Sequence, residues 1–158
     1  TSKPVGAAFN NPSLISQDGM EANTKQWRNA EIPAANGHGT ARSIAKLYGI
    51  LANGGSRDGI HVLKPETIEM SRLPQSEGKD LVLGGMNTKF GLGFMLGNEN
   101  ISMGPNIKSF GHGGAGGSLG FCDPDNHVSL GFVMNQMHPG ITAWKTATDL
   151  ASSVYKSL

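Results

Sequence analysis

The sequence is poor in cysteine, in charge and in long apolar runs. Its single cysteine, Cys122, excludes an internal disulfide and a zinc site built from cysteines. Charged residues make up 16% of the chain, and thirteen basic residues nearly balance twelve acidic ones, so no strong field would attract nucleic acid. The apolar runs are short and broken by glycine, so no membrane span is expected. The histidines show no metal-ligand spacing, and no metal or other cofactor is expected.

Glycine is the residue in excess. The chain has 23 glycines in 158 residues, about twice the usual share. Six of them fall within ten residues, at Gly111, Gly113, Gly114, Gly116, Gly117 and Gly120. The segment contains the letters G-x-G-x-x-G, but a strand-like pattern follows where a dinucleotide site needs a helix. Two interpretations stay open: a tight bend at a sheet edge, or backbone that lets a ligand approach closely.

The periodicity predicts an α+β fold, with antiparallel strands packed by a C-terminal helix. Residues 1–36 have no sustained period and are expected to be mostly loop. Thr40 is placed to cap a helix over 41–53, and Pro65 to open a shorter one ending near residue 73. An apolar stripe at helical spacing predicts the last helix, over 141–158. Alternating residues predict strands over 89–96, 106–110, 118–122 and 127–135, the last two joined by a hairpin turn at 123–126.

Ser43 and Lys46 form an S-x-x-K tetrad, the nucleophile signature of penicillin-binding proteins and class A β-lactamases. One helical turn could bring the lysine amine near the serine hydroxyl. The pair also lies in the first turn of an amphipathic helix, where a solvent-facing serine and lysine are common. The structural interpretation is therefore preferred to the catalytic one.

Three stretches together resemble the β-lactamase-related serine hydrolases, the superfamily of class C β-lactamases, esterases and D-alanyl-D-alanine carboxypeptidases. The first runs from Trp27 to Ser43, with the sequence WRNAEIPAANGHGTARS. The second is Phe90–Phe94, and the third is Phe110–Ser118, which is similar to the family's third active-site box. The resemblance covers essentially the whole chain and implies part of the β-lactamase/transpeptidase-like fold.

The resemblance implies a small set of site residues. His112, Gly113 and Gly114 match the family's H-x-G box, so His112 would face the substrate and both glycines would lie against it. The backbone N–H of Ala115 would be one oxyanion-hole donor. The glycine in the middle of the box removes a hydroxyl that many β-lactamases carry there, which weakens the interpretation as a β-lactamase and leaves ester or amide hydrolysis open.

The resemblance also implies that this chain is the C-terminal portion of such an enzyme, which agrees with a sequence that starts at Thr1. Residues 1–80 would end the helical subdomain, and residues 81–158 would supply strands and the last helix of the α/β subdomain. The family's nucleophile and its Y-x-N box are expected upstream, so the isolated chain is expected to be inactive. The intact protein would act on a small acyl or peptide-like substrate.

The alternative is a non-catalytic scaffold or self-assembling member of the same fold. A truncated sheet leaves unpaired edges, and these favour self-association. Sequence alone predicts neither the compartment nor the acyl substrate.

Overall fold

The computed structural model describes residues 4, 7–8, 20–99, 101–140 and 145–158. The described residues form two compact units, which we describe separately. The first comprises residues 1–39 and 80–86, and the second comprises residues 40–79 and 87–158. The division of the chain near residue 80 between two subdomains of a larger fold stays a prediction.

The first unit contains a 3₁₀ turn, η1 (Met20–Asn23), and a short helix, α2 (Lys25–Asn29), in a region expected to be mostly loop. Thr24 caps α2 by accepting a 3.1 Å hydrogen bond from the Trp27 amide. Trp27 is buried, and its carbonyl accepts a 2.9 Å hydrogen bond from the Asn36 side chain. A local cap and one aromatic anchor thus stabilise a helix too short to show a period.

Helix α3 (Ala41–Ala52) begins the second unit and confirms the predicted helix almost to the residue. Thr40 and Ser43 form a capping box, in which each side chain accepts from the other's backbone amide. Asn53 follows the last turn, and Gly54 and Gly55 take the positive φ angles of 73° and 88° that end a helix without strain.

A two-stranded ribbon of β1 (Ser56–Arg57) and β2 (Ile60–His61) leads to α4 (Pro65–Ser71), whose start at Pro65 is as predicted. A six-stranded sheet follows, in the sequential order β3-β4-β5-β6-β7-β8. Its strands are β3 (Ser76–Asp80), β4 (Met86–Phe90), β5 (Met95–Leu96), β6 (Phe110–Gly113), β7 (Leu119–Asp123) and β8 (Val128–Phe132).

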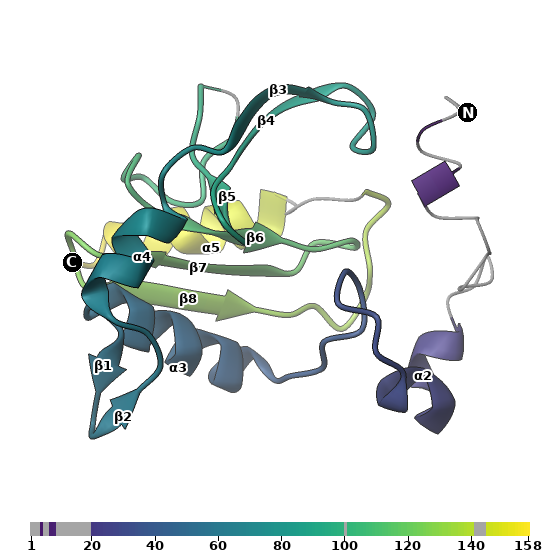
Figure 1. The fold of residues 1–158 in the computed structure, drawn as a ribbon, viewed down its shortest axis with the longest axis horizontal. Coiled ribbons are helices and arrows are strands. Elements are labelled where there is room, and N and C mark those ends of the chain that lie inside the picture. The colour runs from purple at the N-terminus through teal and green to yellow at the C-terminus, as the bar shows by residue number, and fades with distance from the viewer. Residues whose placement is uncertain (1–3, 5–6, 9–19, 100, 141–144) are drawn as a thin grey trace. The chain divides into compact units, whose positions relative to one another are not determined.

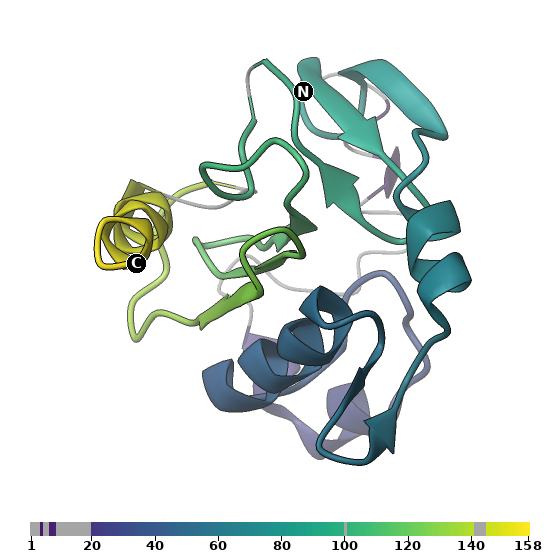
Figure 2. The ribbon, with the colours of Figure 1, turned by 90° about the vertical axis from the view of Figure 1, so that its left-hand side faces the viewer.

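Helices cover the sheet on both faces. Figures 1 and 2 show α3 on one face and the last helix, α5 (Lys145–Tyr155), on the other. On the α3 face, Phe110 and Cys122 are fully buried in a cluster with Leu51, Ile68 and Leu96. Such a sheet between helices matches the predicted α+β class.

Three predictions were wrong in part: the strand over 89–96, the strand over 106–110, and the C-terminal end of the last helix. Residues 89–96 form two strands, because Gly91 packs against α4 and Gly93 turns with a φ of 80°. Of the strand expected over 106–110, only Phe110 is in a strand. In α5, Ala147 and Ala151 are buried as expected, but the helix ends at Tyr155, and Leu158 beyond it is 76% exposed. The first residues of that predicted helix, 141–144, lie outside the described residues.

Candidate functional site

The strand that carries the H-x-G box is open on one side at its end. The β5–β6 ladder pairs Leu96 with Phe110 and Met95 with Gly111, and it stops there. The next two residues, His112 and Gly113, pair only with β7, at Gly120 and Leu119. His112 is exposed, whereas Phe110 and Gly111 before it and Gly113 after it are buried. A ligand could therefore lie along this end of β6.

The imidazole of His112 is held on two sides. Its ring centroid lies 5.8 Å from that of Phe90 on β4, at an interplanar angle of 34°. Its Nδ1 is within hydrogen-bond distance of the carbonyl oxygen of Gly113. If Nδ1 carries the proton and donates to that oxygen, Nε2 is the nitrogen left to accept a proton.

The glycines after His112 form a tight turn into β7. The Gly114 amide donates to the Ser118 carbonyl at 2.8 Å, and the Gly117 amide donates to the Gly114 carbonyl at 3.0 Å. Gly116 and Gly117 have φ angles of 83° and 113°, which favour glycine. The segment joins two strands and opens no helix, which agrees with the exclusion of a dinucleotide site.

Ala115 lies at the exposed tip of this turn. Within the described part of the chain, its amide donates to no backbone or side-chain acceptor, unlike the amides of Gly114, Gly116 and Gly117. An exposed N–H without an internal acceptor can donate to a ligand. His112 and the Ala115 amide lie on one short segment because they are three positions apart in the sequence, and their catalytic roles stay a prediction.

Other glycines of the cluster serve packing instead. A β-carbon on Gly120 would lie 2.6 Å from the Tyr48 ring and 2.7 Å from the Ile44 side chain, both on α3. A β-carbon on Gly111 would lie 2.1 Å from the Gly120 carbonyl oxygen. The glycine excess therefore marks close packing within the sheet and against α3 as well as the edge of a site.

The Ser43–Lys46 tetrad has the preferred structural role. The Ser43 hydroxyl accepts from the Thr40 amide and donates to the Thr40 carbonyl, both at 2.9 Å. Among the described residues, no hydrogen bond joins Ser43 to Lys46 or to His112. Its hydroxyl is occupied by helix capping.

The same tetrad occurs twice more, starting at Ser76 and at Ser153. Sequence reasoning missed both. Ser76 opens strand β3, and the Ser153 hydroxyl donates to the Asp149 carbonyl within α5 at 2.9 Å. Because the tetrad occurs three times in one chain, its presence alone does not identify a nucleophilic serine.

Within the part of the chain that the structure describes, the remaining candidate side chains do not form a cluster. Cys122 is fully buried, and burial raises the pKa of its thiol to about 12, so it is not a thiolate near neutral pH. His61 shares a 2.7 Å hydrogen bond with Ser56, a cross-strand pair that the sequence did not reveal.

No three His, Cys, Asp or Glu side chains within the described residues are grouped to hold a metal ion. No helix among those residues is long and apolar enough to cross a bilayer.

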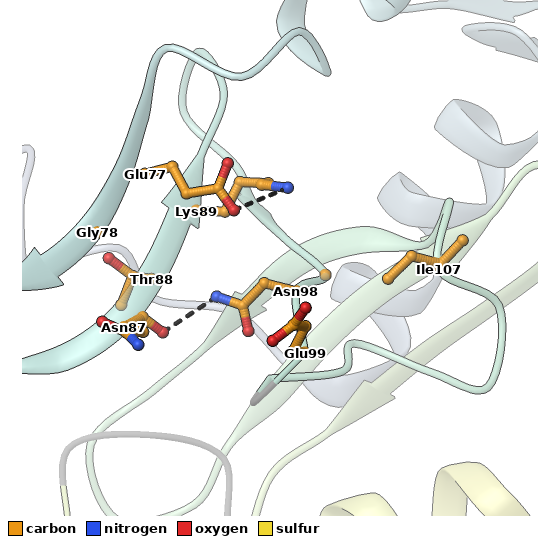
Figure 3. Close-up of a pocket in the computed structure, with 9 residues that line it drawn as sticks. Glu77, Gly78, Asn87, Thr88, Lys89, Asn98, Glu99 and Ile107 are labelled. Carbon is orange, nitrogen blue, oxygen red and sulfur yellow. Dashed lines mark hydrogen bonds and ion pairs between the residues drawn. The ribbon is translucent and has the colours of Figure 1, made fainter.

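A separate pocket of about 460 Å³ lies beside β3 and β4, as Figure 3 shows. Lys89 pairs with Glu77 at 3.0 Å, and Asn98 donates to the Asn87 carbonyl at 3.0 Å, so these polar groups already bind one another. Neither His112 nor Ala115 lines it. Sequence reasoning did not find this pocket; the lining residues are Glu77, Gly78, Asn87, Thr88, Lys89, Gly97, Asn98, Glu99 and Ile107.

The antiparallel sheet with helices on both faces defines an α+β protein. The Beta-lactamase family profile matches residues 5–152. The chain therefore belongs to the Beta-lactamase family.

Known relatives agree with this assignment. The esterase/beta-lactamase LipL of Mycobacterium tuberculosis is 41% identical over 108 residues, which are 68% of this chain and 24% of LipL. A penicillin-binding protein homolog from Caulobacter crescentus is 38% identical with a TM-score of 0.85. A family VIII carboxylesterase is 35% identical with a TM-score of 0.86. Each of these two structures covers 98% of this chain, whereas the chain spans 40% of either.

Proposed function

We propose that this chain forms the C-terminal wall of a serine hydrolase active site that cleaves an ester or an amide. A serine oxygen from another part of the protein would bond to the acyl carbon, and the alcohol or amine would leave with a proton. Water would then release the acid and regenerate the serine. The names of the relatives support this class, since they include an esterase/beta-lactamase and a carboxylesterase.

The observation that carries the proposal is the Ala115 amide, which has no acceptor among the described residues and lies three positions after the exposed His112. In the tetrahedral intermediate the carbonyl oxygen becomes negative, and a fixed N–H aimed at it lowers the barrier. Ala115 is exposed and its amide has no acceptor within the described chain, so this amide can serve as such a donor. The substrate would lie against the exposed His112, where β6 has no partner from β5.

His112 would bind or orient the substrate from the same strand. Its exposed imidazole lies against the Phe90 ring, and with the proton on Nδ1 its Nε2 can accept a hydrogen bond from the substrate, or take up a proton and pass it to the leaving group. The glycines at 113 and 114 present backbone without side chains, which lets the acyl group approach closely.

The test is ester hydrolysis by the full-length protein that contains this chain. We expect turnover of p-nitrophenyl butyrate and labelling of one serine by a fluorophosphonate probe. His112→Asn should lower kcat/KM about 100-fold. The same change at the exposed His127 is the matched control and should leave the rate unchanged, because asparagine tolerates the positive φ of 53° there.

Two results would overturn the proposal. One is a full-length protein that neither turns over esters, amides or β-lactams nor reacts with the probe, which would favour the non-catalytic alternative and prompt measurement of self-association. The other is stoichiometric labelling of Ser43 in the isolated 158-residue chain, because the isolated chain should be inactive.

A further inference from the structure

The turn that carries Ala115 is anchored by the segment that follows β8. The Gly116 amide donates to the Gly140 carbonyl at 3.0 Å, and the Gly116 carbonyl accepts from the His138 amide at 2.9 Å. Both backbone groups of Gly116 are thus bonded to one segment, residues 137–140. The anchored residue directly follows Ala115 in the chain.

Met137 lies directly on this anchor point. A β-carbon on Gly116 would be 2.6 Å from Met137 Cε, 2.8 Å from Cγ and 2.9 Å from Cβ. The methionine side chain therefore occupies the space that glycine leaves open, although it is 67% exposed overall. Gly116 also has a φ of 83°, so no other residue would adopt this backbone without strain.

The two anchors leave the Ala115 amide between fixed neighbours. On one side, the Gly114 amide is bonded to the Ser118 carbonyl; on the other, Gly116 is bonded to residues 138 and 140. A donor on a free turn would reorient when charge develops, whereas a donor on a fixed peptide does not. Small displacements of such a group cost large factors in rate.

We propose that Met137 is a positioning residue for the Ala115 amide. Its side chain covers Gly116 and keeps residues 137–140 hydrogen-bonded to the turn. The amide then points to one place throughout the reaction. The inference rests on the proposed function, since it concerns the same oxyanion donor, and it adds a residue that never contacts the reacting atoms.

The experiment compares three variants of the full-length protein: Met137→Ala, Met137→Leu and Met70→Ala. Met70 lies on α4 and is 56% exposed, so it controls for the loss of a partly exposed methionine. We expect Met137→Ala to lower kcat for p-nitrophenyl acetate about 10-fold with KM changed less than twofold. Met137→Leu should keep most of the rate, because leucine fills a similar volume.

A transition-state analogue separates positioning from a general loss of structure. The affinity of a boronic acid inhibitor should fall in Met137→Ala by the same factor as kcat/KM, because both depend on the oxyanion donor. Hydrogen exchange should show faster exchange of the Gly116 and His138 amides in that variant, with the melting temperature close to that of Met70→Ala.

The inference fails if wild-type protein is active and Met137→Ala matches Met70→Ala in kcat and inhibitor affinity. It also fails if the loss appears wholly in KM, which would indicate substrate binding instead of positioning. A wild-type protein without probe labelling or ester turnover would instead overturn the proposed function. The hydrogen-exchange comparison would still report whether Met137 holds the turn.

Discussion

Tyr155, near the end of α5, donates a 2.6 Å hydrogen bond to the carboxylate of Asp123 at the end of β7. Asp123 is fully buried, and its other oxygen accepts from the Asn106 side chain and from two backbone amides of the hairpin turn. The buried carboxylate is thus stabilised by donors from three parts of the chain. This contact ties the C-terminal helix to the sheet.

Removal of the Tyr155 hydroxyl should loosen this attachment. In Tyr155→Phe the ring remains, but the buried carboxylate loses a charge-assisted hydrogen bond, so the free energy of unfolding should fall by about 1.5–3 kcal/mol. Urea denaturation of the two proteins measures the difference. Ser157→Ala, which removes an exposed hydroxyl that donates to the Val154 carbonyl, is the control and should change stability by less than about 0.5 kcal/mol. Equal midpoints for Tyr155→Phe and wild type would show that the bond contributes nothing.

Asp123 should also make stability depend on acid pH. Burial alone would raise the pKa of this carboxyl, but the hydrogen bonds from Tyr155, Asn126 and Asn106 lower it below its ordinary value. A carboxyl whose pKa is lower in the folded state adds stability above its unfolded pKa of about 3.9, and this stability is lost as the pH falls through the folded value.

The melting temperature of wild type should therefore fall more steeply below pH 4 than that of Asp123→Asn. The variant should be less stable at pH 7 and should approach wild type at low pH, because asparagine carries no charge to lose. Parallel curves for the two proteins from pH 7 to pH 2 would contradict this role for Asp123.

Glycines beneath α3 set how closely the helix approaches the sheet. A β-carbon on Gly131 would lie 2.3 Å from the Ala41 carbonyl oxygen and 2.7 Å from the Ala45 amide nitrogen, both backbone atoms that cannot move aside. At Gly120 the nearest atoms belong to the Tyr48 and Ile44 side chains, which can shift. Gly120→Ala should therefore cost about 1–3 kcal/mol, and Gly131→Ala more.

Thermal unfolding of the two variants tests this order. Gly37→Ala is a suitable control, since nothing lies within 4 Å of a β-carbon there, and it should leave the melting temperature nearly unchanged. If Gly131→Ala lowered the melting temperature less than Gly120→Ala, the prediction would be wrong. Helix α3 would then move away from the sheet as a whole to make room for the added methyl group.

Local signals account for what the sequence predicted well. Thr40, the apolar spacing after it and Gly54 all act within one helix, so α3 could be assigned from these residues alone. The strand expected over 89–96 was interrupted for a tertiary reason. Gly91 leaves no room for a β-carbon, which would lie 2.0 Å from the Ser71 carbonyl oxygen on α4. No pattern within 89–96 reports the position of α4.

In the candidate site, too, residues within one short motif could be predicted, whereas a contact between distant segments could not. His112, Gly113 and Gly114 are contiguous, so a resemblance in one short box located them at the end of β6. Met137 reaches Gly116 across 21 positions in the chain, after a hairpin and a loop, and nothing in its sequence neighbourhood indicates that contact. Contacts made by the fold, and not by the motif, were the ones that sequence reasoning could not find.

The capping role of Ser43 yields the last prediction. Its hydroxyl both accepts from and donates to the Thr40 backbone, so Ser43→Ala removes half of the capping box at the start of α3. The free energy of unfolding should fall by about 0.5–2 kcal/mol. Lys46→Ala should change it little, because the lysine is exposed and alanine favours the helix. If instead the two residues worked as a nucleophile and its base, both substitutions would abolish probe labelling and neither would need to destabilise the helix. Urea denaturation of both variants and fluorophosphonate labelling of the full-length protein that carries each substitution distinguish these outcomes. We expect lower stability for Ser43→Ala and unaltered labelling for both variants.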